Sequence, residues 1–323
     1  MNLPIILLLL LLGIFLIVKG GDLFVEAASW IATVSGIPKL IIGATIVSLA
    51  TTMPEMLVSM MAALQGKVDM SIGNAVGSVT ANIGLIMAIS LFFMPGPISR
   101  MDYLPKAVLM MSAAFIVVIG GLKGQVSVAL SAVLLIIFII FIFENINSAK
   151  HTMTAQSVAK GPGRIRPAKK EITVNVAKFF FGAVGIVAGA DLLVDNGSEL
   201  ARIMGVSERI IGVTIVAVGT SLPELVTTIT AVAKKQASLS VGNILGANIL
   251  DLSLIMPMCA LVSGKSLPIS QASSMVDLPA CFLVGAIAII PAMISSKFSR
   301  WQGILLLAVY IGYVFITCFC MGT

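Results

Sequence analysis

The chain has 323 residues, of which 59% are hydrophobic and only 11% charged, and its formal net charge is +6. A soluble domain usually carries about 25% charged residues, so this composition excludes a soluble protein and predicts an all-α membrane protein. A transmembrane barrel would instead show short segments of alternating hydropathy. Because the lysines and arginines lie between apolar segments, the positive charge reflects membrane topology, and we expect no nucleic-acid partner.

Ten apolar segments are long enough to cross a bilayer, and they predict ten transmembrane helices. In chain order they cover residues 4–32, 38–65, 70–94, 103–121, 125–147, 173–203, 207–233, 238–262, 275–295 and 302–321. The first begins MNLPIILLLLLLG and lacks the basic start and cleavage site of a signal peptide, so we expect it to be retained.

One polar segment, residues 147–171, separates the fifth span from the sixth. It is too short and too polar to form a core, so we interpret it as a cytoplasmic linker. It divides the chain into a first five-helix repeat, residues 1–146, and a second, residues 172–323.

The two halves repeat each other. Residues 36–55 read GIPKLIIGATIVSLATTMPE and residues 205–224 read GVSERIIGVTIVAVGTSLPE, with ten of twenty positions identical. The separation is 169 residues both between Glu55 and Glu224 and between Gly73 and Gly242. Since each half has five spans, the second half enters the membrane in the opposite orientation, the inverted repeat of many secondary transporters.

The distribution of lysine and arginine sets the expected orientation. The loops that face the cytoplasm carry more of these residues when the N-terminus lies outside. We therefore expect both termini to be extracytoplasmic, in the inner membrane of a prokaryote.

Each repeat carries a glutamate inside an apolar span, on a helix face with other oxygen-bearing groups. In the second span Ser48, Thr51, Thr52 and Glu55 follow helical spacing, and Pro54 is expected to kink the helix and free backbone carbonyls. The seventh span repeats this pattern with Ala217, Thr220, Ser221, Pro223 and Glu224. Hydroxyl, carbonyl and carboxylate oxygens are the ligands of Na⁺ and Ca²⁺.

The third and eighth spans add a polar stripe beside a G-x-x-x-G pair, which lets another helix approach closely. The stripes are Asn74, Ser78 and Asn82 in the third span and Asn243, Ala247 and Asp251 in the eighth. Two facing glutamates would repel each other; a divalent cation or several monovalent cations would neutralise them, and protonation is the other way to remove the repulsion. An ionisable group within the bilayer marks a transport site by default, and we expect exchange of one cation load for another.

With these motifs the chain resembles the sodium/calcium exchangers of the cation/calcium exchanger superfamily, of the archaeal or bacterial type. The motifs are GATIVSLATTMPE at 43–55, GNAVGSVTANIGL at 73–85, GVTIVAVGTSLPE at 212–224 and GNILGANILDL at 242–252. The resemblance implies Na⁺/Ca²⁺ antiport by alternating access, with no cofactor and a chain that works as a monomer in lipid.

The resemblance also implies a diamond of four cation sites. The calcium site would use Glu55 and Glu224 with the carbonyls of Thr51 and Thr220. One sodium site would use Ser78, Ser221 and the carbonyl of Ala217, and the other Thr52, position 247 and the carbonyl of Ser48. Asn82 and Asp251 would complete the middle of the diamond.

Three positions depart from the family pattern. Thr52 stands where serine is usual but keeps a hydroxyl, Ala247 removes one sodium-site oxygen, and Val79 replaces an asparagine. Sodium coupling is therefore less secure than calcium binding. The proton-coupled branch, which carries a glutamate after G-N in the third and eighth spans, is the alternative.

Two other classes compete with an exchanger. A channel could use two inward carboxylates, although the implied oxygen cage favours occlusion, and single-channel currents would distinguish it. An intramembrane hydrolase would need the two carboxylates as a dyad, and turnover of a lipid phosphate or a peptide would reveal it. The chain is expected not to be an enzyme.

Overall fold

The computed structural model describes residues 3–66, 68–160, 167–205, 219, 221–264, 266–271 and 273–317. Its elements comprise α-helices, short two-residue strands and π-helical segments, written η. In the first half they are α1 (Leu3–Ser35), α2 (Lys39–Ile42), η1 (Gly43–Val47), α3 (Ser48–Leu64), α4 (Val68–Ala81), η2 (Asn82–Met87), α5 (Ala88–Phe93), β1 (Gly96–Pro97), α6 (Arg100–Leu122), β2 (Gln125–Val126) and α7 (Val128–Lys160). In the second half they are α8 (Lys169–Ile203), α11 (Leu222–Ala233), α12 (Ala237–Leu250), η4 (Asp251–Ile255), α13 (Met256–Ser263), β3 (Leu267–Pro268), η5 (Ser273–Asp277), α14 (Leu278–Ser295), β4 (Lys297–Phe298) and α15 (Arg300–Phe315).

The predicted all-α membrane fold is confirmed. Among the described residues, eight helical stretches are long and apolar enough to cross a membrane, and two shorter apolar helices accompany them, Leu222–Ala233 and Arg300–Phe315. The count of ten spans stays a prediction, because residues 207–218 of the expected seventh span lie outside the described residues. Outward-facing apolar side chains, such as the 65% exposed Leu8 and Leu11, suit contact with lipid tails.

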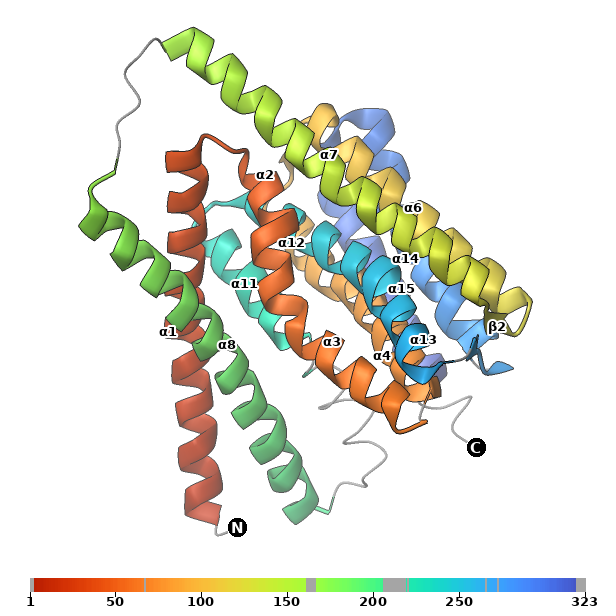
Figure 1. Ribbon diagram of the computed structural model, residues 1–323. Coiled ribbons are helices and arrows are strands. Elements are labelled where there is room, and N and C mark those ends of the chain that lie inside the picture. Colours follow the sequence, from red (N-terminus) through yellow and green to blue (C-terminus); the bar gives the residue numbers. More distant parts are fainter. Residues whose placement is uncertain are drawn as a thin grey trace.

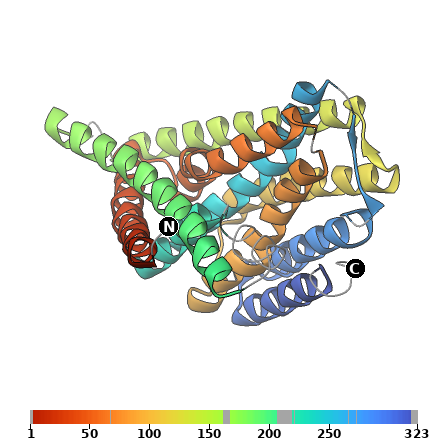
Figure 2. The same cartoon turned by 90° about the horizontal axis from the view of Figure 1, so that it is seen from below.

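Helices α1 and α8 lie side by side at one edge of the molecule (Figures 1 and 2). Glycines make this close crossing possible. A Cβ atom on Gly20 would lie 2.9 Å from the carbonyl oxygen of Gly182, and a Cβ on Gly182 would lie 2.9 Å from that of Gly20. Van der Waals packing and close backbone contact therefore join the first helices of the two halves.

Helix α12 runs through the middle of the bundle (Figure 1), and every residue from Leu239 to Leu250 is buried. It packs against α2, η1 and α3. A Cβ on Gly246 would lie 2.7 Å from the carbonyl carbon of Ala44 and 2.5 Å from Ser48 Oγ. The G-x-x-x-G pair of α12 therefore serves the close helix approach that its spacing predicts, and it brings the second half against the first.

Several elements recur at the repeat distance. Helices α4 and α12 both have 14 residues, and each is followed by a π-helical segment that begins at an equivalent residue, Asn82 or Asp251. Two antiparallel strand pairs, β1 with β4 and β2 with β3, each join one strand from either half. The two halves therefore repeat the same helical elements, and the strand pairs connect one half to the other.

Helices α7 and α8 extend into the polar segment between the halves. Helix α7 continues to Lys160 and α8 begins at Lys169, so much of the expected linker has a helical backbone. Near it, the fully buried Lys106 on α6 pairs with Glu144 on α7, with Nζ to Oε2 at 2.8 Å. Glu144 therefore neutralises a buried ammonium group close to the polar segment.

Candidate cation-binding site

The second-span residues singled out in the sequence all lie inside the bundle. Ser48, Thr51, Thr52 and Glu55 are each at most 3% exposed on α3. The helix continues through Pro54 rather than ending there, and the departure from α-helical bonding is the π segment η1 directly before Ser48. Proline has no N–H, so Pro54 leaves the carbonyl of Ala50 without its helical donor, and η1 adds a second irregularity of the kind that is frequent at functional sites.

The equivalent residues of the second half lie at a helix N-terminus. Ser221 precedes α11, Pro223 stands in the first turn and Glu224 is buried in that turn. The positive end of a helix dipole stabilises a carboxylate there. Ala217 and Thr220 lie outside the described residues.

The third and eighth spans contribute buried polar groups from α4, η2 and η4. Ser78 is 4% exposed on α4, while Asn82 and Asp251 are buried at the first positions of η2 and η4. Each π segment adds a residue to a helical turn, which changes the direction of the side chains around it. Ala247 is fully buried on α12 and supplies no side-chain oxygen.

Three side-chain hydrogen bonds join the two halves at this point. Thr52 Oγ1 donates to Glu224 Oε1 at 3.2 Å, and Thr51 Oγ1 donates to Asn243 Oδ1 at 3.2 Å. Asn82 Nδ2 donates to Asn248 Oδ1 at 3.1 Å. The predicted site residues therefore converge at the interface between the repeats.

Several buried oxygen atoms here have no hydrogen-bond partner in the described part of the chain. They are Glu55 Oε2, Glu224 Oε2, both carboxylate oxygens of Asp251, Asn82 Oδ1 and Ser221 Oγ. Each such group costs about 1–3 kcal/mol, and more when charged, unless a ligand satisfies it. Buried oxygen atoms that no N–H or O–H group satisfies are free to coordinate a cation, and hard cations prefer oxygen ligands of this kind.

The acidic groups of this cluster are close enough to act on one another. The carboxyl groups of Glu55, Glu224 and Asp251 act on one another electrostatically. None of the ion pairs recorded among the described residues involves these three acids. In the same residues, no three acidic, histidine or cysteine side chains converge on one metal position, so a cation here would also need hydroxyl, amide or carbonyl oxygens.

Several contributing residues were absent from the predicted ligand set. Asn243 and Asn248 bond directly to predicted site residues, and Asn74 Nδ2 donates to Ser59 Oγ at 2.9 Å and to the carbonyl oxygen of Glu55 at 3.4 Å. The available signal was the repeat itself, since Asn74 and Asn243 stand at equivalent positions.

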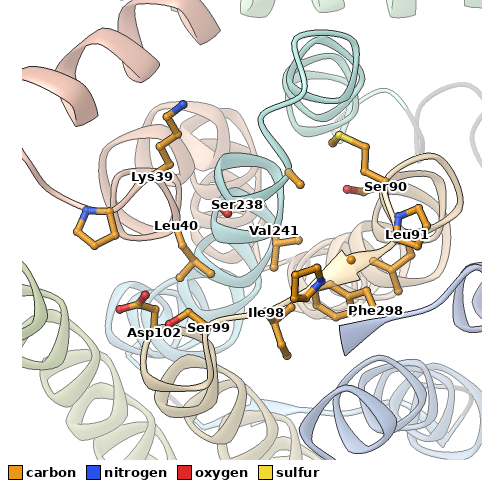
Figure 3. A pocket seen from close by; sticks show the side chains of 16 residues that line it. Lys39, Leu40, Ser90, Leu91, Ile98, Ser99, Asp102, Ser238, Val241 and Phe298 are labelled. Atoms are coloured by element: carbon orange, nitrogen blue, oxygen red, sulfur yellow. The ribbon is translucent and has the colours of Figure 1, made fainter. Parts of the chain in front are cut away.

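A separate cavity of about 440 Å³ lies beside β1 and the N-terminal ends of α2, α6 and α12 (Figure 3). Lys39, Asp102 and Ser238 line it, and none of the three buried acids does. Ser90 also lines it and accepts a 3.1 Å hydrogen bond from the hydroxyl of Ser240, which lies less than one helical turn before Asn243. The buried serine pair therefore lies between this cavity and the part of α12 that carries Asn243.

The comparison with protein families matches the model described as "Sodium/calcium exchanger protein" to residues 5–146 and 174–319. Among curated proteins, the uncharacterized membrane protein MJ0091 of Methanocaldococcus jannaschii is 31% identical, covering 93% of this chain and 94% of that protein. The sodium/calcium exchanger MaX1 of Methanosarcina acetivorans is 28% identical, covering 96% and 97%.

Solved structures of the sodium-calcium exchanger NCX_Mj have the same fold. One of them, soaked with 2.5 mM Na⁺ and 10 mM Sr²⁺, superposes with a TM-score of 0.81 at 30% identity, covering 97% of this chain and 99% of that one. The similarity extends over nearly the whole chain and includes all the described helices that carry the acidic cluster.

Proposed function

The chain belongs to the sodium/calcium exchanger protein family, and from this premise we propose that it exchanges Na⁺ for Ca²⁺ by alternating access at the site between its repeats. The family consists of membrane antiporters, and the resemblance inferred from the two repeated motifs is confirmed. The alternative of proton-coupled exchange is not favoured by these relatives.

The observation that carries the assignment is the cluster of buried, donor-free oxygens. We assign the calcium ligands to Glu55 and Glu224, together with the carbonyls of Thr51 and Thr220. Two carboxylates balance the charge of one divalent ion, and the remaining oxygens complete a coordination shell of six to eight. The hydrogen bond from Thr52 to Glu224 orients the second carboxylate toward the first half.

Sodium would bind on both sides of the calcium position. One site would use Ser78, Ser221 and the carbonyl of Ala217, and the buried, unpartnered Ser221 Oγ supports it. The other would use Thr52 and the carbonyl of Ser48. It lacks a side-chain oxygen at the buried Ala247, so it is the weaker of the two.

Asn82 and Asp251 would form the middle of the arrangement. Both carboxylate oxygens of Asp251 and Oδ1 of Asn82 are buried without partners among the described residues. When Ca²⁺ has left, Na⁺ can balance the negative charge at Asp251. A site without any cation would carry unpaired charges, and the cost of burying them would keep it from crossing the membrane.

The repeat boundaries, orientation and assembly are part of the same proposal. Repeats at 1–146 and 172–323, joined by a cytoplasmic linker at 147–171, agree with the gap between the two matched family segments. Both termini would be extracytoplasmic, in a prokaryotic inner membrane, with the protein working as a monomer in lipid. We propose no enzymatic activity, cofactor or nucleic-acid partner.

The test is ⁴⁵Ca²⁺ uptake into proteoliposomes loaded with Na⁺. Uptake should require internal Na⁺, saturate with external Ca²⁺ and stop when the Na⁺ gradient is removed. Matched vesicles without Na⁺ and with an imposed pH gradient provide the comparison. Uptake that follows the proton gradient alone would show that the protein is a proton-coupled exchanger. Single-channel currents would show that it is a channel.

A further inference from the structure

Asn74 and Asn243 occupy equivalent positions in the two repeats but are bonded differently. Asn74 Nδ2 bridges Ser59 Oγ at 2.9 Å and the carbonyl oxygen of Glu55 at 3.4 Å. These contacts tie α4 to the turn of α3 that carries Glu55. The amide of Asn74 therefore holds in place the backbone of a residue assigned to the cation site.

The equivalent hydrogen bonds are not formed in the second half. Thr228 and Glu224 stand at the positions equivalent to Ser59 and Glu55, and α11 packs against α12 as α3 packs against α4. Yet Asn243 Nδ2 and Thr228 Oγ1 are both buried without a hydrogen-bond partner in the described residues. Asn243 instead accepts a bond through Oδ1 from Thr51, across the repeat interface.

Burying the Asn243 amide and the Thr228 hydroxyl without hydrogen bonds costs stability at two neighbouring helices, α12 and α11. Buried polar groups are nearly always satisfied, and a donor and an acceptor at positions whose repeat equivalents are bonded point to a second arrangement that joins them. The unpaired amide of Asn243 and hydroxyl of Thr228 are such a donor and acceptor.

Inverted repeats provide that second arrangement. If the two halves exchange conformations when access switches from one side to the other, each contact made by one half in one state is made by its equivalent in the other state. This step depends on the alternating access proposed above.

We propose that Asn74 and Asn243 are positioning residues whose side chains engage alternately during transport. In the described conformation Asn74 binds Ser59 and the Glu55 carbonyl, and Asn243 is disengaged from α11. In the conformation open to the opposite side, Asn243 donates to Thr228 and to the Glu224 carbonyl, and Asn74 is released. The two asparagines thereby set the balance between the two access states.

The test measures the apparent Ca²⁺ affinity of Na⁺-dependent uptake at each membrane face, in right-side-out and inside-out vesicles. Because apparent affinity scales with the fraction of protein open to that side, the ratio of the two affinities reports the balance between the states. Asn74→Ala should change this ratio about fivefold in one direction and Asn243→Ala about fivefold in the other, the equivalent of one buried hydrogen bond each.

Partner variants and a double variant complete the design. Ser59→Ala should change the ratio in the same direction as Asn74→Ala, and Thr228→Val in the same direction as Asn243→Ala. The double variant Asn74→Ala/Asn243→Ala should return the ratio to near that of the unaltered protein. A purely structural role would lower stability or uptake without moving the ratio in opposite directions.

Two results would overturn the proposal: a ratio that moves in the same direction for both asparagine variants, or one that stays unchanged in variants that still transport. Either result would leave Na⁺-dependent uptake by the unaltered protein intact. Loss of the proposed function itself would instead appear in the unaltered protein, as uptake that needs no Na⁺.

Discussion

Replacing Gly246 by alanine should misalign the cation site by separating the two halves. The added Cβ would lie 2.7 Å from the carbonyl carbon of Ala44 and 2.5 Å from Ser48 Oγ. Ordinary van der Waals contact begins at 3.4 Å, and the carbonyl oxygen of Ala44 would be closer still than its carbon, so the backbone at Ala44 must move by at least about 0.7 Å. The hydroxyl of Ser48 can rotate away, but a backbone carbonyl inside a helix cannot.

That displacement exceeds what the site tolerates. Metal–ligand distances hold to within about 0.2 Å, and a functional site must be held to about 0.5 Å. Since α12 leads into Asp251 and the helix through Ala44 leads into Glu55, a shift between them stretches the oxygen cluster. We expect Gly246→Ala to lose about 1–3 kcal/mol of stability from overpacking and at least tenfold in apparent Ca²⁺ affinity.

The measurement is ⁴⁵Ca²⁺ uptake against Ca²⁺ concentration, with thermal unfolding in detergent as the stability readout. Gly312→Ala is the matched control, because it makes the same change inside helix α15 where an added Cβ meets no described atom within 4 Å. That variant should keep both affinity and stability. If Gly246→Ala behaves like Gly312→Ala, the close approach of α12 does not hold the site together.

Three further predictions follow from the same site and its surroundings. Glu55→Gln and Glu224→Gln should each abolish Na⁺-dependent Ca²⁺ uptake while the protein folds, because a ligand charge is lost and the shape is kept; near-normal uptake by either variant would remove that residue from the site. Ala247→Ser should increase sodium affinity or the steepness of the sodium dependence, measured as uptake against internal Na⁺, and an unchanged curve would show that the absent hydroxyl is irrelevant. Glu144→Gln should lower the free energy of unfolding by about 3–5 kcal/mol by stranding the buried Lys106 ammonium, whereas Lys106→Met/Glu144→Gln should recover most of it, which thermal unfolding would check.

The structure buries the acidic residues that the repeat alone identifies in the sequence. Glu55 and Glu224 were singled out because an acid in an apolar span is costly and each half carries one, and both are buried in the bundle. Asp251 followed from its equivalence to Asn82, and both begin π-helical segments.

Other parts of the site depend on contacts that no local pattern contains. Helical spacing placed Thr51 and Thr52 on one face but could not show that Thr52 bonds to Glu224 while Thr51 bonds to Asn243. The irregular backbone was expected at Pro54, and the π segment before Ser48 was not foreseen, because proline is visible in a sequence and a widened helical turn is not.

The amino-acid sequence by itself determined that this is a helical membrane protein with an internal repeat and an acid in each half, because hydropathy, repetition and residue type can be read along the chain. Only the tertiary structure decided which groups meet and which are left unpaired. Partners such as Asn82 and Asn248 are 166 residues apart, and they meet because helix packing brings the halves together. The difference between Asn74 and Asn243, equivalent in sequence, arises from that packing alone.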